Sequence, residues 1–189
     1  MSVFSKVFTP VDYVRIKHPE KRFFDCVLPV ITAIAITIVI SVLPKSVSII
    51  GKDSLVSLVN GILQILSGFY IASMAAVATF SKEGMDDVMQ GEPPKLKKQK
   101  LTRRKFLTYL FGYLAFMSIA LYFIGGALQL TSSSIKELHL SSILKAALLF
   151  CYLTAVCNII YTTALGMFFM IDKMHDEKTK LIIKDQDKG

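Results

Sequence analysis

Four long apolar runs, almost free of charge, alternate with shorter polar segments along the chain. They cover residues 27–43, 55–80, 106–130 and 143–171, and the only charged residue inside them is Lys145, close to one end. A membrane-spanning helix needs about 20 apolar residues to cross the roughly 30 Å hydrocarbon core of a bilayer. The pattern therefore predicts an all-α integral membrane protein with four transmembrane helices.

Composition supports this interpretation and excludes a soluble globular protein. Of the 189 residues, 53% are hydrophobic and 19% are charged, and the mean hydropathy is +0.53. We expect a lead over residues 1–25, a four-helix membrane domain over 26–171, and a charged tail over 172–189. Tyr109, Tyr113 and Tyr122 are expected to anchor the third span at the membrane interfaces.

The basic residues predict how the chain is oriented. Five Lys and Arg precede the first run, eight lie between the second and third, and five follow the fourth, whereas the other two loops hold only Lys45, Lys52 and Lys136. Loops rich in Lys and Arg stay on the cytoplasmic side of a membrane. Both termini and the middle loop are therefore predicted to be cytoplasmic, and much of the net charge of +8 is accounted for by topology.

The lead carries a predicted short amphipathic helix. Thr9 is expected to be its N-cap, with Pro10 at the first helical position. Its apolar side chains recur every three or four residues, at Phe4, Val7, Phe8, Val11 and Val14. Such a stripe fits a helix lying in the membrane interface and fits equally well a helix packed on the cytoplasmic ends of the spans.

The middle loop, residues 81–105, divides at two prolines into an acidic half and a basic half. We interpret the basic half first as an orientation signal that also contacts anionic lipid head groups, and second as a docking patch for an acidic cytosolic protein. Direct nucleic-acid binding is disfavoured, because no aromatic side chain accompanies the charge. The basic residues are Lys95, Lys97, Lys98, Lys100, Arg103, Arg104 and Lys105.

Polar and small residues recur at four-residue steps in two of the runs. Such rows predict close helix packing, within one chain or between copies, and the two rows could meet. The alternative is a narrow polar path lined by Asn60, Gln64 and Asn158. The second run holds Asn60, Gln64, Gly68, Ala72 and Ala76, and the fourth holds Thr154, Asn158, Thr162 and Gly166.

Nothing in the sequence indicates catalysis. The runs contain no Asp, Glu, Arg or His in their interiors, so the ionisable relay of a proton-coupled transporter is not expected. The sequence has no phosphate-binding glycine loop, nucleophile motif or zinc-ligand spacing. Cys26, Cys151 and Cys157 are interpreted as packing residues. We therefore predict no catalytic, cofactor or metal site and no enzyme activity.

The overall order of features resembles that of a known family. The features are a basic amphipathic lead, four spans, the loop sequence PPKLKKQKLTRRK at residues 93–105 and a lysine-rich tail. This layout resembles small bacterial four-span proteins encoded beside a soluble effector, and in particular the membrane subunit of the Kiwa anti-phage defence system. The resemblance implies an inner-membrane oligomer that holds a cytosolic DNA-binding partner and responds to phage infection. It assigns no role to an individual residue.

Two functional hypotheses follow. The first is a non-enzymatic membrane scaffold or sensor subunit that contacts anionic lipids, forms a homo-oligomer and docks a cytosolic protein partner on its basic face. The second, from a different class, is a small channel or membrane-permeabilising effector lined by Asn60, Gln64 and Asn158.

Overall fold

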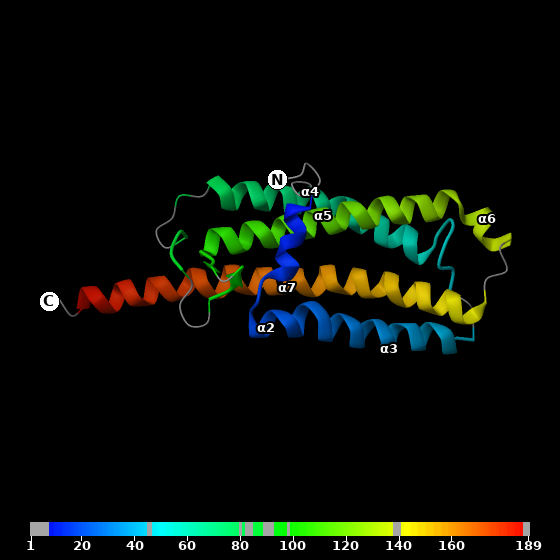
Figure 1. The fold of residues 1–189 in the computed structure, drawn as a ribbon, viewed down its shortest axis with the longest axis horizontal. Coiled ribbons are helices and arrows are strands. Elements are labelled where there is room, and N and C mark those ends of the chain that lie inside the picture. The colour runs from blue at the N-terminus through cyan, green and yellow to red at the C-terminus, as the bar shows by residue number, and fades with distance from the viewer. Residues whose placement is uncertain are drawn as a thin grey trace.

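The computed structural model of the chain is a bundle of long antiparallel helices (Figure 1). It describes residues 8–44, 47–79, 81, 85–88, 93–97, 99–137 and 141–186. Four of the described helices are long and apolar enough to cross a membrane, namely Phe23–Val42, Leu55–Thr79, Arg103–Leu130 and Ser142–Ile171. The prediction of an all-α protein with four candidate membrane helices is confirmed.

The helix bounds agree with the apolar runs at most ends. Helix α4 covers Leu55–Thr79 and α5 covers Arg103–Leu130. Helix α7 runs from Ser142 to Gln186 and thus continues beyond the fourth apolar run into the charged tail. The short helix α6, Ser132–Glu137, joins α5 to the segment before α7.

The first span is longer than predicted and contains a carboxylate. Helix α2 (Pro19–Arg22), the π-helical segment η2 (Phe23–Val27) and α3 (Leu28–Val42) follow one another without a break. The candidate span therefore starts at Phe23 rather than at residue 27. Asp25 is the third residue of this candidate span and lies at its start, before the apolar run from residue 27. A π-helical turn inside an α-helix often marks a functional site.

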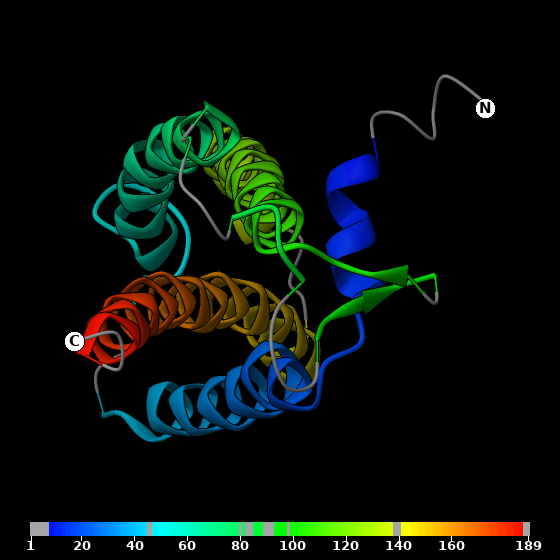
Figure 2. The same ribbon diagram turned by 90° about the vertical axis from the view of Figure 1, so that its left-hand side faces the viewer.

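The four long helices form two pairs, seen end-on in Figure 2. Helix α4 packs along α5, α3 packs along α7, and α5 and α7 join the two pairs. The buried face of α4 is marked by Val56, Leu63, Tyr70 and Val77. These residues are spaced by seven, the repeat that keeps one face of a helix turned toward a partner helix.

The N-terminal helix η1 (Thr9–Arg15) is a 3-10 helix that lies across the bundle rather than along it (Figure 1). Phe8 occupies the N-cap position and Thr9 is already helical, so the predicted N-cap was wrong. Helix η1 packs on α5, where Tyr13 is fully buried and the Phe8 ring lies 6.1 Å from that of Phe116. Phe4 and Val7 lie outside the described residues.

A short antiparallel hairpin completes one end of the bundle. Strand β1 (Lys95–Leu96) pairs with β2 (Gln99–Lys100). Lys17, which follows η1, exchanges two backbone hydrogen bonds with Lys95, with N···O distances of 3.0 and 3.2 Å. The N-terminal segment is therefore tied to the hairpin. We call this end of the bundle, which also carries the C-terminal part of α7, the hairpin end (Figures 1 and 2).

Candidate interaction sites at the hairpin end

The polar row predicted on the second span does not form one packed face. Asn60 is 8% exposed, whereas Gln64, Gly68, Ala72 and Ala76 are all exposed on the surface of the chain. Four residues exceed one helical turn by about 40°, so four such steps rotate the row by about 160° around the helix axis. The row therefore starts on the buried face of α4 and ends on the outer face.

Asn60 joins α4 to α5 at a point of close approach. Its side-chain amide nitrogen donates a hydrogen bond of 3.3 Å to the backbone oxygen of Tyr122. A Cβ atom placed on Gly125 would clash with the Asn60 Oδ1, so a larger residue there would displace the Asn60 amide. Gln64 faces outward, and its side chain forms no hydrogen bond with a residue that the structure describes. The two amides therefore have different roles.

The polar row on α7 faces the interior of the bundle. Thr162 is fully buried and Gly166 is buried against Leu110, while Thr154 and Asn158 are partly exposed. The row does not meet that of α4. The hydrogen bond that joins these two helices is instead between Tyr70 and Thr163, at 2.6 Å.

Asp25 is the centre of a buried polar network that connects the first span to α7. Its carboxylate accepts a hydrogen bond of 3.1 Å from the Thr162 hydroxyl. Its backbone oxygen accepts one of 2.7 Å from the Asn158 amide. The Oδ1 of Asn158 in turn accepts a hydrogen bond of 2.8 Å from Tyr113. Tyr113 was predicted to be an interface anchor, but it is buried within this network.

The same carboxylate holds the N-terminal segment. Lys21 lies 2.8 Å from Asp25, and both side chains are less than 10% exposed. Tyr13 of η1 donates a hydrogen bond of 3.3 Å to Asp25, stacks on Tyr113 at 4.9 Å and has the Lys21 ammonium 4.3 Å from its ring centre. Burial and the adjacent Asp25 raise the pKa of the Tyr13 hydroxyl far above its ordinary value.

Arg104, predicted to belong to an exposed basic patch, has a structural role. It donates two hydrogen bonds to Asp86, of 2.8 and 3.1 Å, and two more to the backbone oxygens of Val77 and Ala78 at the end of α4. The hydrogen bond from Arg104 lowers the pKa of Asp86 below its ordinary value. Arg103 is also partly buried, so neither arginine is a fully exposed cation.

The lysines of the basic half remain on the surface. Lys95, Lys97, Lys100 and Lys105 are exposed, and none forms an ion pair with a residue that the structure describes. Lys98 lies outside the described residues. Lys97 has a φ of 48°, in the left-handed region, and forms part of the turn between the two strands. The alternation of the hairpin buries Leu96 and leaves Lys95 exposed.

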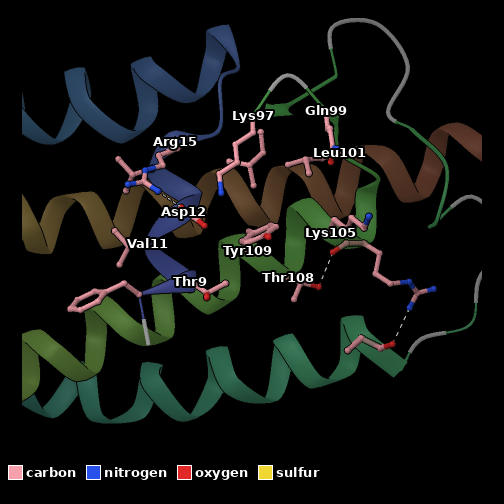
Figure 3. Close-up of a pocket in the computed structure, with 15 residues that line it drawn as sticks. Thr9, Val11, Asp12, Arg15, Lys97, Gln99, Leu101, Lys105, Thr108 and Tyr109 are labelled. Carbon is pink, nitrogen blue, oxygen red and sulfur yellow. Dashed lines mark hydrogen bonds and ion pairs between the residues drawn. The ribbon is translucent and has the colours of Figure 1, made fainter. Parts of the chain in front are cut away.

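A groove of about 1110 Å³ runs between η1, the hairpin and the first turns of α5 (Figure 3). Apolar side chains from the hairpin end line it, including the buried Leu96 and Leu101 and the partly buried Tyr109. Cationic side chains also line it, and they are Arg15, Lys97, Arg104 and Lys105. Among the described residues of the lining, Asp12 is the only acidic one, and Arg15 pairs with it at 2.7 Å. The groove thus combines an apolar surface with an excess of positive charge.

The sequence contained a signal for the Asp25 network, although hydropathy alone missed it. Lys21 and Asp25 are four residues apart, the spacing at which side chains of opposite charge meet on a helix. Extending the first helix backward through this pair would have placed both at the start of the span. The partners from other helices, Tyr13, Tyr113 and Thr162, depend on the tertiary fold.

Among the described residues, no group of three or more His, Cys, Asp or Glu side chains is placed to hold a metal ion. Comparison of the chain with protein-family models, with curated proteins and with solved structures finds no significant match.

Proposed function

We propose that the protein is a non-enzymatic membrane scaffold and sensor subunit that forms a homo-oligomer and docks an acidic cytosolic protein in the groove of Figure 3. The observation that carries this proposal is the combination, in one groove, of an apolar lining with the exposed Lys97 and Lys105, which form no ion pair with a residue that the structure describes. An amphipathic segment with acidic residues on one edge is complementary to such a groove, in the manner of helix-in-groove recognition.

The sensor part of the proposal rests on how the groove is connected to the membrane helices. Helix η1 forms one wall of the groove, and its Tyr13 is bonded to Asp25 at the start of the first span. Asp25 is bonded in turn to α7 through Thr162 and Asn158. Occupation of the groove would therefore act on the same residues that join the first and fourth spans.

Charge reversal in the groove tests the docking proposal. The chain is co-expressed with soluble acidic proteins encoded beside it and purified in detergent, and the retained protein is quantified. Lys97→Glu combined with Lys105→Glu should abolish retention, and raising the salt concentration should weaken it, because exposed charges are screened over about 8 Å at physiological ionic strength. Lys52→Glu, at the opposite end of the bundle, is the matched control. Equal retention by both variants would contradict the proposal.

The proposed homo-oligomer rests on Gln64. An amide in hydrocarbon without a partner is costly, at roughly 4 to 8 kcal/mol on a cyclohexane scale. Gln64 lies near the middle of α4, faces outward, and is flanked by Gly61 and Gly68, where an added Cβ would meet nothing within 4 Å. Another copy of the chain could approach this bare backbone closely and satisfy the amide.

The channel alternative is favoured by no arrangement within one chain. Asn60 packs against Gly125, Asn158 is bonded to Tyr113 and Asp25, and Gln64 faces outward. A conducting path would therefore require several copies with Gln64 facing a shared axis. Ion flux through liposomes that contain the purified protein distinguishes the two hypotheses, since the scaffold proposal expects none.

The proposed orientation places the hairpin end in the cytoplasm of a bacterial inner membrane. Its support is the excess of Lys and Arg in the segments that converge there. A reporter fused after Gly189 should be cytoplasmic, and one inserted near residue 136 should be external. The resemblance in layout extends the proposal to anti-phage defence, and deletion of the gene should then increase phage plating on the host.

A further inference from the structure

A row of three lysines crosses the paired segments at the hairpin end. Lys17 pairs with Lys95, and Lys95 pairs with Lys100, all in antiparallel register. Directly opposed residues on neighbouring strands place their side chains on the same face. The backbone N–H and the backbone oxygen of Lys95 both form their hydrogen bonds with Lys17. The Lys95–Lys100 pair is therefore of the type without backbone hydrogen bonds, which brings side chains closest together.

Such a row is unfavourable without a counterion. Like charges directly opposed on adjacent strands destabilise a sheet. None of the three lysines forms an ion pair with a residue that the structure describes. The paired segments therefore place three exposed lysines side by side, an arrangement that a bound anion would stabilise.

The three lysines line a second cavity, distinct from the groove of Figure 3 and on the other face of the hairpin. It has a volume of about 890 Å³ and is also lined by His18, Lys21, Arg22 and Asp25. Of the lining residues that the structure describes, Asp25 alone carries a carboxylate, and it is already paired with Lys21. The imidazole Nδ1 of His18 is buried and has no hydrogen-bond partner among the residues that the structure describes. The cavity thus offers several cations to a ligand.

We propose that this cavity binds a phosphate-bearing anion with more than one negative charge, held chiefly by Lys17, Lys95 and Lys100. Phosphate oxygens accept several charge-assisted hydrogen bonds at once, and lysine is a common partner for them. The cavity volume falls within the usual range for small-molecule sites. The same chemistry could come from a soluble polyphosphate or from an anionic lipid head group.

The site would also connect ligand binding to the membrane helices. Lys21 and Asp25 form part of the cavity wall and also belong to the network that joins the first span to α7. An anion in the cavity would compete with Asp25 for the Lys21 ammonium. This inference is independent of the proposed function, which uses the opposite face of the hairpin.

The test uses the full chain in nanodiscs and two probes. Sodium tripolyphosphate is titrated into protein held in phosphatidylcholine nanodiscs, and separately the protein is placed in nanodiscs containing phosphatidylglycerol. Thermal unfolding is followed in both arms, and calorimetry follows the titration. Binding or stabilisation in either arm supports the proposal and identifies the source of the phosphate. A wild-type chain that responds in neither arm would overturn it.

Two matched double variants locate the site. Lys95→Gln with Lys100→Gln should weaken binding by about tenfold or more, since each lost charge-assisted hydrogen bond contributes substantially to affinity. Lys97→Gln with Lys105→Gln, in the groove on the other face, should bind as the wild type does. Without ligand, the first variant should unfold at the same temperature as the wild type or higher, because a repulsion has been removed. Equal losses in both variants, or a lower unfolding temperature of the first, would overturn the proposal.

Discussion

The two helix pairs of the bundle are held together by different physical means. Helix α4 packs along α5, buries a seven-residue repeat of largely apolar side chains, and approaches α5 closely between Asn60 and Gly125. Helices α3 and α7 meet through a smaller apolar cluster around Ala33, Leu149 and Leu153 and through the buried network of Asp25. The stability of the α4–α5 pair should therefore depend most on the volume of its side chains, and that of the α3–α7 pair on their charge.

The largest effect is expected at Asp25. Replacing it with Leu leaves the Lys21 ammonium buried and without its counterion, and breaking a buried pair in this way typically costs about 3–5 kcal/mol. Lys21→Met should lower the stability by a similar amount, because it leaves the Asp25 carboxylate without its counterion. The double variant should recover much of the stability, since an apolar pair leaves no buried charge. Unfolding of the purified protein in increasing dodecyl sulfate measures the effect, and simple addition of the two losses would contradict the account.

The α4–α5 pair should be most sensitive at Gly125. An added Cβ would clash with the Asn60 side chain, and such overpacking usually costs about 1–3 kcal/mol. Gly126→Ala is the matched control, because a Cβ there meets nothing within 4 Å. Combining Gly125→Ala with Asn60→Ala should restore stability. The packing interpretation fails if the two glycine variants unfold alike.

Substitutions at Asn60 and Gln64, the two amide residues of α4, should have different effects, the first on folding and the second on assembly. Asn60→Leu should lower the stability of the single chain, because it lies at the contact with α5. Gln64→Leu should leave chain stability unchanged and shift the oligomer distribution, by about 0.6 kcal/mol for each hydrogen bond lost. Crosslinking and native mass spectrometry in mild detergent would measure this. An unchanged distribution in Gln64→Leu would remove Gln64 from the assembly surface.

The smallest effect is expected at Arg104, which lies at the start of α5 and bonds to the end of α4. Its hydrogen bond lowers the pKa of Asp86 below the ordinary value of 3.8. The contribution of the Arg104–Asp86 pair to the stability of the fold is therefore complete above pH 3.8, and it is lost as the pH falls through the lowered pKa of Asp86. Arg104→Gln should return the Asp86 pKa to its ordinary range in an NMR titration. An Asp86 pKa that does not change would show that the pair is absent in solution.

Hydropathy predicted the four spans because each run is long and nearly uncharged, and that signal needs no tertiary information. The start of the first span was predicted too late, at residue 27, because hydropathy stops at the charge of Asp25. In the structure that charge is neutralised by Lys21. The row from Asn60 to Ala76 drifts around the helix because four residues exceed one turn, so only Asn60 is buried within the chain. The groove and the lysine row could not be predicted, since both depend on Lys17 pairing with a hairpin far away in sequence.

The most direct test of the docking proposal is site-specific photocrosslinking in intact cells. A photoreactive amino acid at Tyr109 lies in the groove of Figure 3, and one at Ile160 lies on an exposed part of α7 within the fourth span. The account predicts a crosslink from position 109 to an acidic soluble protein, lost when Lys97 and Lys105 are changed to Glu, and none to soluble protein from position 160. Crosslinks from position 109 to lipid alone, or to a protein whose capture survives charge reversal, would contradict it.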